Sequence, residues 1–386
     1  MKLKTKLTKI GRDPKKNKGY VNPPIYKGST IIFNDFISYI KDRDEKEDDK
    51  SHYGIQYNPT CNEFENAISS LYGAADTVAT PSGLTALIIP FLTFLKKGDH
   101  VLVSDALYNP TRHFCNKILL NFGIKIDFFH PTRNINNFEK LIKKNTKLIF
   151  LESPGTTTFD IIDFPKITKI AKKYNLITVS DNTWASPIFC NPFKLGVNIV
   201  VEAATKYING HSDILLGFIS SDNLTAKNIR SYTKTLGICP GSEEIYLALR
   251  GLPTLELRIK EIEKNALNLA IKLTKEKKIK KVFHPALKSH KNYKIWKRDF
   301  SGSSGLFSFE LKKKYSDSKL EKFYKKFKLF KIGYSWGGFE SLITFPTIYN
   351  RKYKEIIKGS LVRIYCGLEN SEDQINDITE ALKVLR

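Results

Sequence analysis

The sequence predicts an α/β protein with a mostly parallel sheet in a large domain, followed by a smaller α+β domain. From about residue 75, short apolar, β-branched runs alternate with longer segments of helical length. The short runs are apolar almost throughout, which is typical of parallel strands covered by helices on both faces. After about residue 252 this alternation stops. We therefore divide the chain into residues 1–57, 58–252 and 253–386.

Residues 1–57 are expected to form an extended arm. Their periodicity is weak, Gly and Pro are scattered through them, and charges crowd the segment Asp42–Lys50. A segment without a regular apolar face has no core of its own to bury. We expect this arm to contact a neighbouring subunit.

The large domain is predicted from six strands and the helical segments between them. The strands are His100–Ser104, Lys125–Phe129, Leu148–Leu151, Ile177–Ser180, Ile199–Glu202 and Leu215–Ser220. The helical segments are Ser82–Leu95, Pro110–Phe122, Phe138–Lys144 and Phe164–Tyr174. The most apolar run, Leu84–Leu95, is shorter than the roughly 18–20 residues of a membrane span and contains Pro90, so we expect a buried helix.

The C-terminal part is predicted to mix helices, strands and glycine turns. In order, these are the helix Leu255–Lys277, the Gly/Ser stretch Ser301–Gly305, the strand Leu306–Leu311, the helix Ser318–Phe327, the turn Gly337–Gly338, the strand Leu361–Tyr365 and a terminal helix.

The composition is that of a folded globular protein. The chain has 386 residues, 41% of them hydrophobic, and a mean hydropathy of -0.30, which argues against disorder. No secretory signal is expected, because no apolar stretch follows the N-terminal lysines. The five cysteines are odd in number and lack a CxxC pair, which excludes a zinc ribbon and argues against a disulfide framework. They are expected to be small core residues of a cytoplasmic protein, with no metal site.

The net charge of +24 has two explanations. Basic patches bind nucleic acid, whereas an AT-rich genome enriches lysine throughout a chain. Lysines are spread along this chain and mixed with acids, as in Lys41–Lys50. We therefore expect neither a nucleic-acid partner nor, without a spanning segment, a membrane.

Charged residues follow three successive predicted strands. These are Glu152, Asp181 and Lys206, and ligands of open α/β sheets bind beyond the carboxyl ends of strands. Lys206 is the only lysine between Leu195 and Ala226. Burial would lower its pKa and leave a neutral amine that can form a Schiff base. The alternative is a lysine whose amine reaches solvent from the strand end.

Asp181 ends an apolar strand and needs a donor or a positive partner there. It could cap the next helix, or it could pair with the ring nitrogen of pyridoxal 5′-phosphate (PLP), which also requires a Schiff-base lysine. A phosphate could bind where Pro81–Thr85 opens a helix, although Ser-Gly in this position is commonly a simple cap. Tyr108 could stack on a cofactor ring or pack in the core. Arg363, between apolar neighbours, could clamp a substrate carboxylate or form an internal salt bridge.

Several motifs together identify a family. The segments "SDNTW" (180–184) and "ATKYINGHSD" (204–213) resemble the ring-binding and Schiff-base segments of the Cys/Met-metabolism family of PLP enzymes. The resemblance extends along nearly the whole chain. "LESPG" (151–155), "WKRDFSGSSGLFSF" (296–309) and "YSWGGFESL" (334–342) look most like its bacterial cystathionine β-lyase branch.

The resemblance implies a fold, an assembly and an activity. The fold would be the aspartate aminotransferase-like fold type I, in a homotetramer built from two active dimers. The activity would be β-elimination of L-cystathionine to homocysteine, pyruvate and ammonia, a step of methionine biosynthesis.

The resemblance also implies roles for individual residues. Lys206 would be the PLP lysine and general base, Asp181 the partner of the ring nitrogen, and Tyr108 the stacking residue. Gly83, Leu84 and Thr205 would bind the phosphate, and Tyr53 would come from the neighbouring subunit. The residues expected to bind substrate are Arg363, Ser335, Trp336 and Tyr334. Trp336 replaces the aliphatic residue usual in γ-acting relatives, which favours β-elimination.

Two positions depart from the family pattern. The family has Tyr-x-Arg after the Tyr53 position, with the arginine on the phosphate, whereas this chain has Ile55. Ala203 stands where the γ-acting branch has a serine, although β-lyase-like sequences share a small residue there. The first departure predicts weaker PLP retention or slower turnover.

Other functions stay open from the sequence. A γ-synthase or γ-lyase of the same family is the nearest alternative, and a catalytically inactive homologue or a basic nucleic-acid-binding protein are more distant ones. Racemisation of a small amino acid such as alanine is a possible side activity, because the same carbanion can be reprotonated on its other face.

Overall fold

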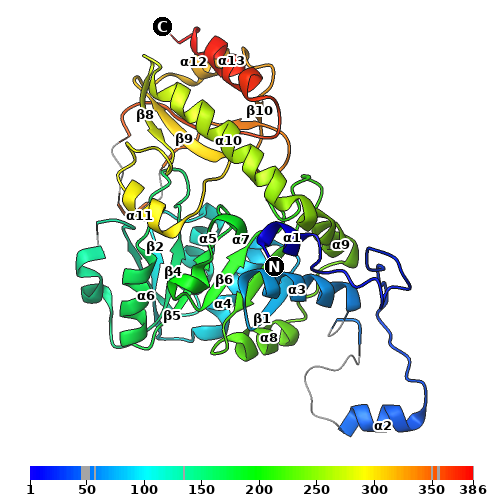
Figure 1. Cartoon of the computed structure of the whole chain (residues 1–386). Coiled ribbons are helices and arrows are strands. Elements are labelled where there is room, and N and C mark those ends of the chain that lie inside the picture. The colour runs from blue at the N-terminus through cyan, green and yellow to red at the C-terminus, as the bar shows by residue number, and fades with distance from the viewer. Residues whose placement is uncertain (45–52, 56–57, 134, 349–350, 354–356, 386) are drawn as a thin grey trace.

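The computed structural model describes residues 1–44, 53–55, 58–133, 135–348, 351–353 and 357–385. Figure 1 shows a large domain around one sheet and a smaller domain around a second sheet, with the long helix α10 (Leu255–Thr274) running from one to the other. An N-terminal arm leaves the large domain (Figure 1).

The large sheet has seven strands in the order β1-β7-β6-β5-β4-β2-β3. They are β1 (Asp76–Thr80), β2 (His100–Ser104), β3 (Lys125–Phe129), β4 (Thr146–Glu152), β5 (Ile177–Asp181), β6 (Ile199–Glu202) and β7 (Gly217–Ser221). Strands β2 to β6 are parallel, and β7 is antiparallel to both of its neighbours. Since β4, β5 and β6 are adjacent, their carboxyl ends meet at one edge, as the sequence predicted.

Helices cover both faces of this sheet. They are α3 (Pro59–Tyr72), α4 (Gly83–Phe94), α5 (Asn109–Phe114), α6 (Phe164–Lys173), α7 (Ser186–Phe189), α8 (Ala226–Thr235) and α9 (Ser242–Gly251). Short π- and 3-10-helical turns are Cys115–Leu119, Ile135–Leu141, Pro192–Leu195 and Leu252–Thr254. Alternate residues of a strand enter different cores: Val101 and Val103 pack in one, and Leu102 in the other. Burial on both faces explains why the strands are continuous apolar runs.

The smaller sheet has the order β10-β11-β12-β9-β8. Its strands are β8 (Ile279–Phe283), β9 (Leu306–Leu311), β10 (Lys331–Ile332), β11 (Leu342–Thr344) and β12 (Leu361–Tyr365), and the helices of this part are α10, α11 (Tyr293–Asp299), α12 (Asp317–Tyr324) and α13 (Ser371–Leu382). Strand β12 lies between β11 and β9 and is antiparallel to both.

The arm is extended only in part. It begins with helix α1 (Leu3–Leu7), whose Leu7 is fully buried against the body. Helix α2 (Phe36–Asp44) stands away from the body in Figure 1, and Phe36 and Ile37 on it are 74% and 80% exposed. Most of the predicted charge-dense segment lies in residues 45–52, outside the described residues.

Several sequence predictions were wrong in detail. Strand β1 was missed because Asp76–Thr80 is short and half polar. The predicted helix Phe138–Lys144 is a 3-10 turn over Ile135–Leu141, interrupted by non-helical Asn137. Cys239 is exposed rather than a core residue, whereas Cys115, Cys190 and Cys366 are buried; all five thiols are free.

Two negative findings concern the described residues only. Among them, no helix combines the length and apolar character that a membrane crossing needs. The same residues contain no group of three or more His, Cys, Asp or Glu side chains placed to hold a metal ion.

Candidate active site

Lys206 lies in the loop between β6 and β7, and its amine points toward the small domain. Its Nζ donates a hydrogen bond to Oγ of Ser335 at 2.6 Å, and it lies 5.5 Å from the ring centre of Trp336. Burial lowers the pKa of Lys206 to about 8, and the positive charge of Arg363 contributes to this shift. The negative charge of Asp181 raises the pKa and offsets part of it. The neutral, nucleophilic form of the amine is therefore populated near neutral pH.

The Lys206 loop is held by two close contacts with the small domain. A Cβ added at Gly337, which has φ +94°, would lie 2.8 Å from Cα of Lys206, so only glycine permits this approach. At the far end of the loop, the hydroxyl of Ser212 donates a hydrogen bond to Oε1 of Glu340 at 2.7 Å. These contacts position the lysine from both domains.

Asp181 presents one open carboxylate oxygen. Its Oδ1 accepts hydrogen bonds from the backbone N–H of Thr183 at 2.9 Å and from the Thr183 hydroxyl at 2.6 Å. Its Oδ2 has no hydrogen-bond partner among the described residues. Burial raises the pKa of Asp181, while the two Thr183 bonds and the charge of Lys206 lower it. No described residue therefore compensates fully for the burial of the anion. A protonated ring nitrogen would supply one.

The N-terminus of α4 offers free amides for a phosphate. The side chain of Ser82 caps the helix by accepting from the N–H of Thr85 at 3.1 Å. The N–H groups of Gly83 and Leu84 have no partner among the described residues, which is the arrangement that binds anions at helix N-termini. Gly83 also packs directly on Ala203, since a Cβ there would lie 2.4 Å from the Ala203 Cβ.

The Thr205 hydroxyl is hydrogen-bonded to the backbone of Leu216. Its hydroxyl donates to the carbonyl of Leu216 at 3.1 Å and accepts from the Leu216 N–H at 2.9 Å. A phosphate contact would therefore require the hydroxyl to turn away from the Leu216 carbonyl. Its phosphate role stays a prediction.

The guanidinium of Arg363 on β12 has no hydrogen bond or ion pair with the described residues, although its backbone pairs in the sheet. Burial lowers its pKa, and the sequence alternative of an internal salt bridge is not found in that part of the chain. A half-buried guanidinium without a partner is costly, so an incoming carboxylate would be bound strongly. Tyr108, 45% exposed, lies close enough to Asp181 and Arg363 for both charges to affect its pKa, which burial raises.

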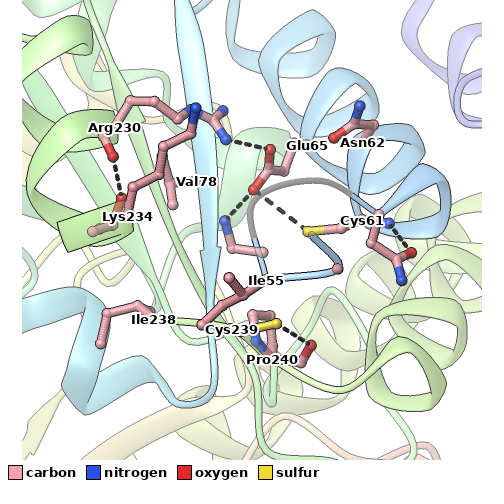
Figure 2. Close-up of a pocket in the computed structure, with 14 residues that line it drawn as sticks. Ile55, Cys61, Asn62, Glu65, Val78, Arg230, Lys234, Ile238, Cys239 and Pro240 are labelled. Atoms are coloured by element: carbon pink, nitrogen blue, oxygen red, sulfur yellow. Dashed lines mark hydrogen bonds and ion pairs between the residues drawn. The ribbon is translucent and has the colours of Figure 1, made fainter. Parts of the chain in front are cut away.

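Tyr334 lies near enough to Arg363 to affect its pKa, whereas the contacts of Tyr53 and Ile55 lie elsewhere. Tyr334 is 89% exposed, and Tyr53 is half exposed and pairs with Thr30 in the arm. Ile55 lines a cavity of about 40 Å³. Figure 2 shows its side chain between those of Cys61 and Cys239. Arg230 lines the same cavity, where Glu65 holds it at 2.9 Å. The residues that line this cavity do not include Lys206, Asp181 or Arg363.

Glu152 is a site residue to which the sequence assigned no role. It lies 7% exposed at the end of β4, in register with Asp181 on β5. Burial, together with the nearby charge of Asp181, raises the pKa of Glu152 to about 8. The sequence signal was its position at the end of a strand.

The assembled residues fit PLP on structural grounds. The open Oδ2 of Asp181 suits a ring N–H, the free amides of Gly83 and Leu84 suit a phosphate, and the amine of Lys206 suits an aldehyde. The unpaired Arg363 suits the carboxylate of an amino acid.

The lowered pKa of Lys206 predicts how PLP capture depends on pH. At pH 7 a lysine with a pKa of about 8 is neutral in roughly 10% of molecules, against roughly 0.03% for an exposed lysine. The rate at which cofactor-free protein captures PLP, followed by its visible absorbance, should rise about tenfold per pH unit and level off above about pH 8. A rate that keeps rising to pH 10 would contradict the lowered pKa.

Comparisons with known proteins identify the family of the chain. The family model "Cys/Met metabolism PLP-dependent enzyme" matches residues 4–383. A Wolbachia pipientis protein named L-alanine/L-glutamate racemase is 38% identical, covering 99% of this chain and 97% of that protein. The Escherichia coli protein named cystathionine beta-lyase MetC is 34% identical, and the match covers 98% of this chain and 97% of that protein. The crystal structure of metB from Corynebacterium glutamicum superposes with a TM-score of 0.91 at 28% identity, covering 100% and 99%.

Proposed function

The chain belongs to the Cys/Met-metabolism family of PLP-dependent enzymes with the type I fold, and on this premise we propose that it is a cystathionine β-lyase. The observation that supports this most is the convergence of Lys206, the open oxygen of Asp181 and the unpaired Arg363. Relatives named cystathionine beta-lyase support the choice of reaction. Trp336 beside the Lys206 amine supports β- over γ-elimination.

The chain's residues divide the work of the reaction. PLP, when bound, withdraws electrons from the Cα of the amino acid joined to it. Asp181 would keep the ring nitrogen protonated, with its own orientation fixed by Thr183. Arg363 would hold the substrate α-carboxylate, which orients the Cα–H bond toward Lys206. The freed amine of Lys206 would take the Cα proton as a general base.

The same groups complete the elimination. The Cβ–S bond breaks with its electron pair leaving on sulfur, and Lys206 or Tyr108 would give a proton to the thiolate. Water then hydrolyses the remaining three-carbon unit. L-cystathionine and water thus give homocysteine, pyruvate and ammonia.

One assay tests this reaction against its nearest alternative. Purified yellow protein is given L-cystathionine, and thiol and keto acid are measured together. We expect homocysteine and pyruvate in equal amounts. Cysteine with 2-oxobutyrate would instead identify a γ-lyase, and the absence of any thiol would exclude both.

We also propose that the enzyme acts as a homotetramer of two active dimers in the cytoplasm. The arm supports the assembly, because it carries exposed apolar side chains with no core of its own, among them Tyr20, Ile32, Phe36 and Ile37. Tyr53 pairs with Thr30 of the arm and has no hydrogen bond with the Lys206 site among the described residues, which supports a site shared between copies. The free cysteines suit a reducing compartment. Light scattering of the purified protein tests the assembly.

Replacing Ile55 with arginine tests the shared site. Ile55→Arg should restore a charge-assisted contact from the arm to the cofactor phosphate, worth about 1.5–3 kcal/mol, and lower the dissociation constant of PLP by roughly 10- to 100-fold. The measurement is PLP release from the holoenzyme on dilution, with Ile55→Lys as a control that adds charge without the planar fork. An unchanged dissociation constant would mean that another group already binds the phosphate.

Racemisation is a second candidate function. The relative named L-alanine/L-glutamate racemase supports it, as does Tyr108, a proton carrier near Asp181 and Arg363. If racemisation occurs, L-alanine in deuterated water should lose its Cα proton and yield D-alanine without keto acid. Retention of the α-proton would eliminate this activity.

A further inference from the structure

A buried carboxylate beside the site is used by none of the steps above. Glu152 Oε2 accepts a hydrogen bond from the backbone N–H of Tyr108 at 2.5 Å. Its Oε1 accepts from the backbone N–H of Thr156 at 2.9 Å and from the Thr156 hydroxyl at 2.6 Å. Three donors therefore converge on one side chain that is 7% exposed.

The contact to Glu152 holds the backbone N–H of Tyr108, whose carbonyl accepts from the N–H of Arg112 at 3.2 Å. Tyr108 is the N-cap of α5, and its side chain makes no capping hydrogen bond. Its N–H has no other partner among the described residues. The position of its ring, next to Asp181 and Arg363, thus depends on where Glu152 holds the main chain.

We propose that Glu152 is a positioning residue for the reaction, which acts by holding the backbone of Tyr108 so that its ring faces the Asp181–Lys206 site. The measurement of kcat in the test below rests on the proposed function. The measurement of PLP loss does not, because it needs no substrate. No hydrogen bond or ion pair joins Glu152 to Lys206 or to Arg363.

The hydrogen-bond pattern defines a selective substitution. In Glu152→Gln, the amide carbonyl can keep both donors from Thr156, and the NH₂ group then faces the N–H of Tyr108. Two donors face each other there, so the Tyr108 contact is lost and the Thr156 contacts remain. Thr156→Val is the matched control, since it removes a hydroxyl bond to the same carboxylate and leaves the Tyr108 bond in place.

The test combines kinetics with cofactor retention in the holoenzyme. Glu152→Gln should lower kcat by about 10- to 100-fold with KM changed less than about threefold, because Arg363 is untouched. It should also speed PLP loss on dilution and change the visible absorbance of the bound cofactor. Thr156→Val should stay within about threefold of the parent in all of these. If Glu152→Gln does not fold, Glu152→Asp, which shortens the side chain by one methylene, should give the same pattern.

A double-mutant cycle with Tyr108→Ala decides the route of the effect. If Glu152 acts through Tyr108, adding Glu152→Gln to Tyr108→Ala should change kcat and PLP loss by less than about twofold. Fully multiplicative losses, or equal losses in Thr156→Val, would overturn the inference. The measurements of PLP loss and of absorbance need no substrate. If only the lyase assay fails, the proposed reaction is rejected, and these two measurements still test the role of Glu152.

Discussion

Asp181→Asn is expected to lower kcat for β-elimination by about 1,000-fold while the fold is retained. The asparagine carbonyl can still accept both donors of Thr183, so its orientation is kept. Its NH₂ group then occupies the place of the open Oδ2, where it cannot stabilise a protonated ring nitrogen. Loss of one partner of a buried charge pair costs about 3–5 kcal/mol, and 4 kcal/mol is roughly 1,000-fold in rate.

The control for this prediction is Thr183→Val. It removes the hydroxyl bond at 2.6 Å but leaves the charge of Asp181, so kcat should fall by no more than about tenfold. Steady-state kinetics and circular dichroism of both variants, with PLP content measured in parallel, check the comparison. A similar kcat in Asp181→Asn and in the parent would remove Asp181 from the mechanism.

Substitution of Arg363 should separate substrate binding from stability. Arg363→Met should raise KM for L-cystathionine by about 100-fold or more, because a charge-assisted contact to the carboxylate is lost. The thermal unfolding temperature should be unchanged or higher. Burial lowers the pKa of Arg363, which means that the folded state disfavours its charge, and no described residue pairs with it.

Arg363→Lys serves as the matched variant for this prediction. It keeps the charge but not the bidentate geometry, so its KM should lie between those of the parent and Arg363→Met. Kinetics and differential scanning calorimetry check both effects. A lower unfolding temperature in Arg363→Met with an unchanged KM would identify Arg363 as a structural residue.

The sequence predicted the parts of the site that depend on strand ends. Asp181 and Lys206 could be located because each follows an apolar strand, and adjacent parallel strands deliver their ends to one edge. Arg363 could be recognised as unusual because it interrupts an apolar strand. The family motifs then gave the cofactor and the fold, which the family match and the structural superposition confirm.

Other parts depend on contacts between distant segments. The bond from Lys206 to Ser335 joins positions 129 residues apart, and the bond from Glu152 to Tyr108 joins positions 44 apart. No local pattern predicts either one. Strand β1 was missed because its pairing with β7 decides its structure more than its own residues do.

Covalent labelling tests the central claim, that Lys206 holds PLP, most directly. The yellow protein is reduced with borohydride, digested, and analysed by mass spectrometry. We predict one stable phosphopyridoxyl group per chain, on the peptide that contains Lys206, and none in Lys206→Ala. A label on a different lysine, or a Lys206→Ala protein that still releases thiol from L-cystathionine at the parent rate, would contradict it.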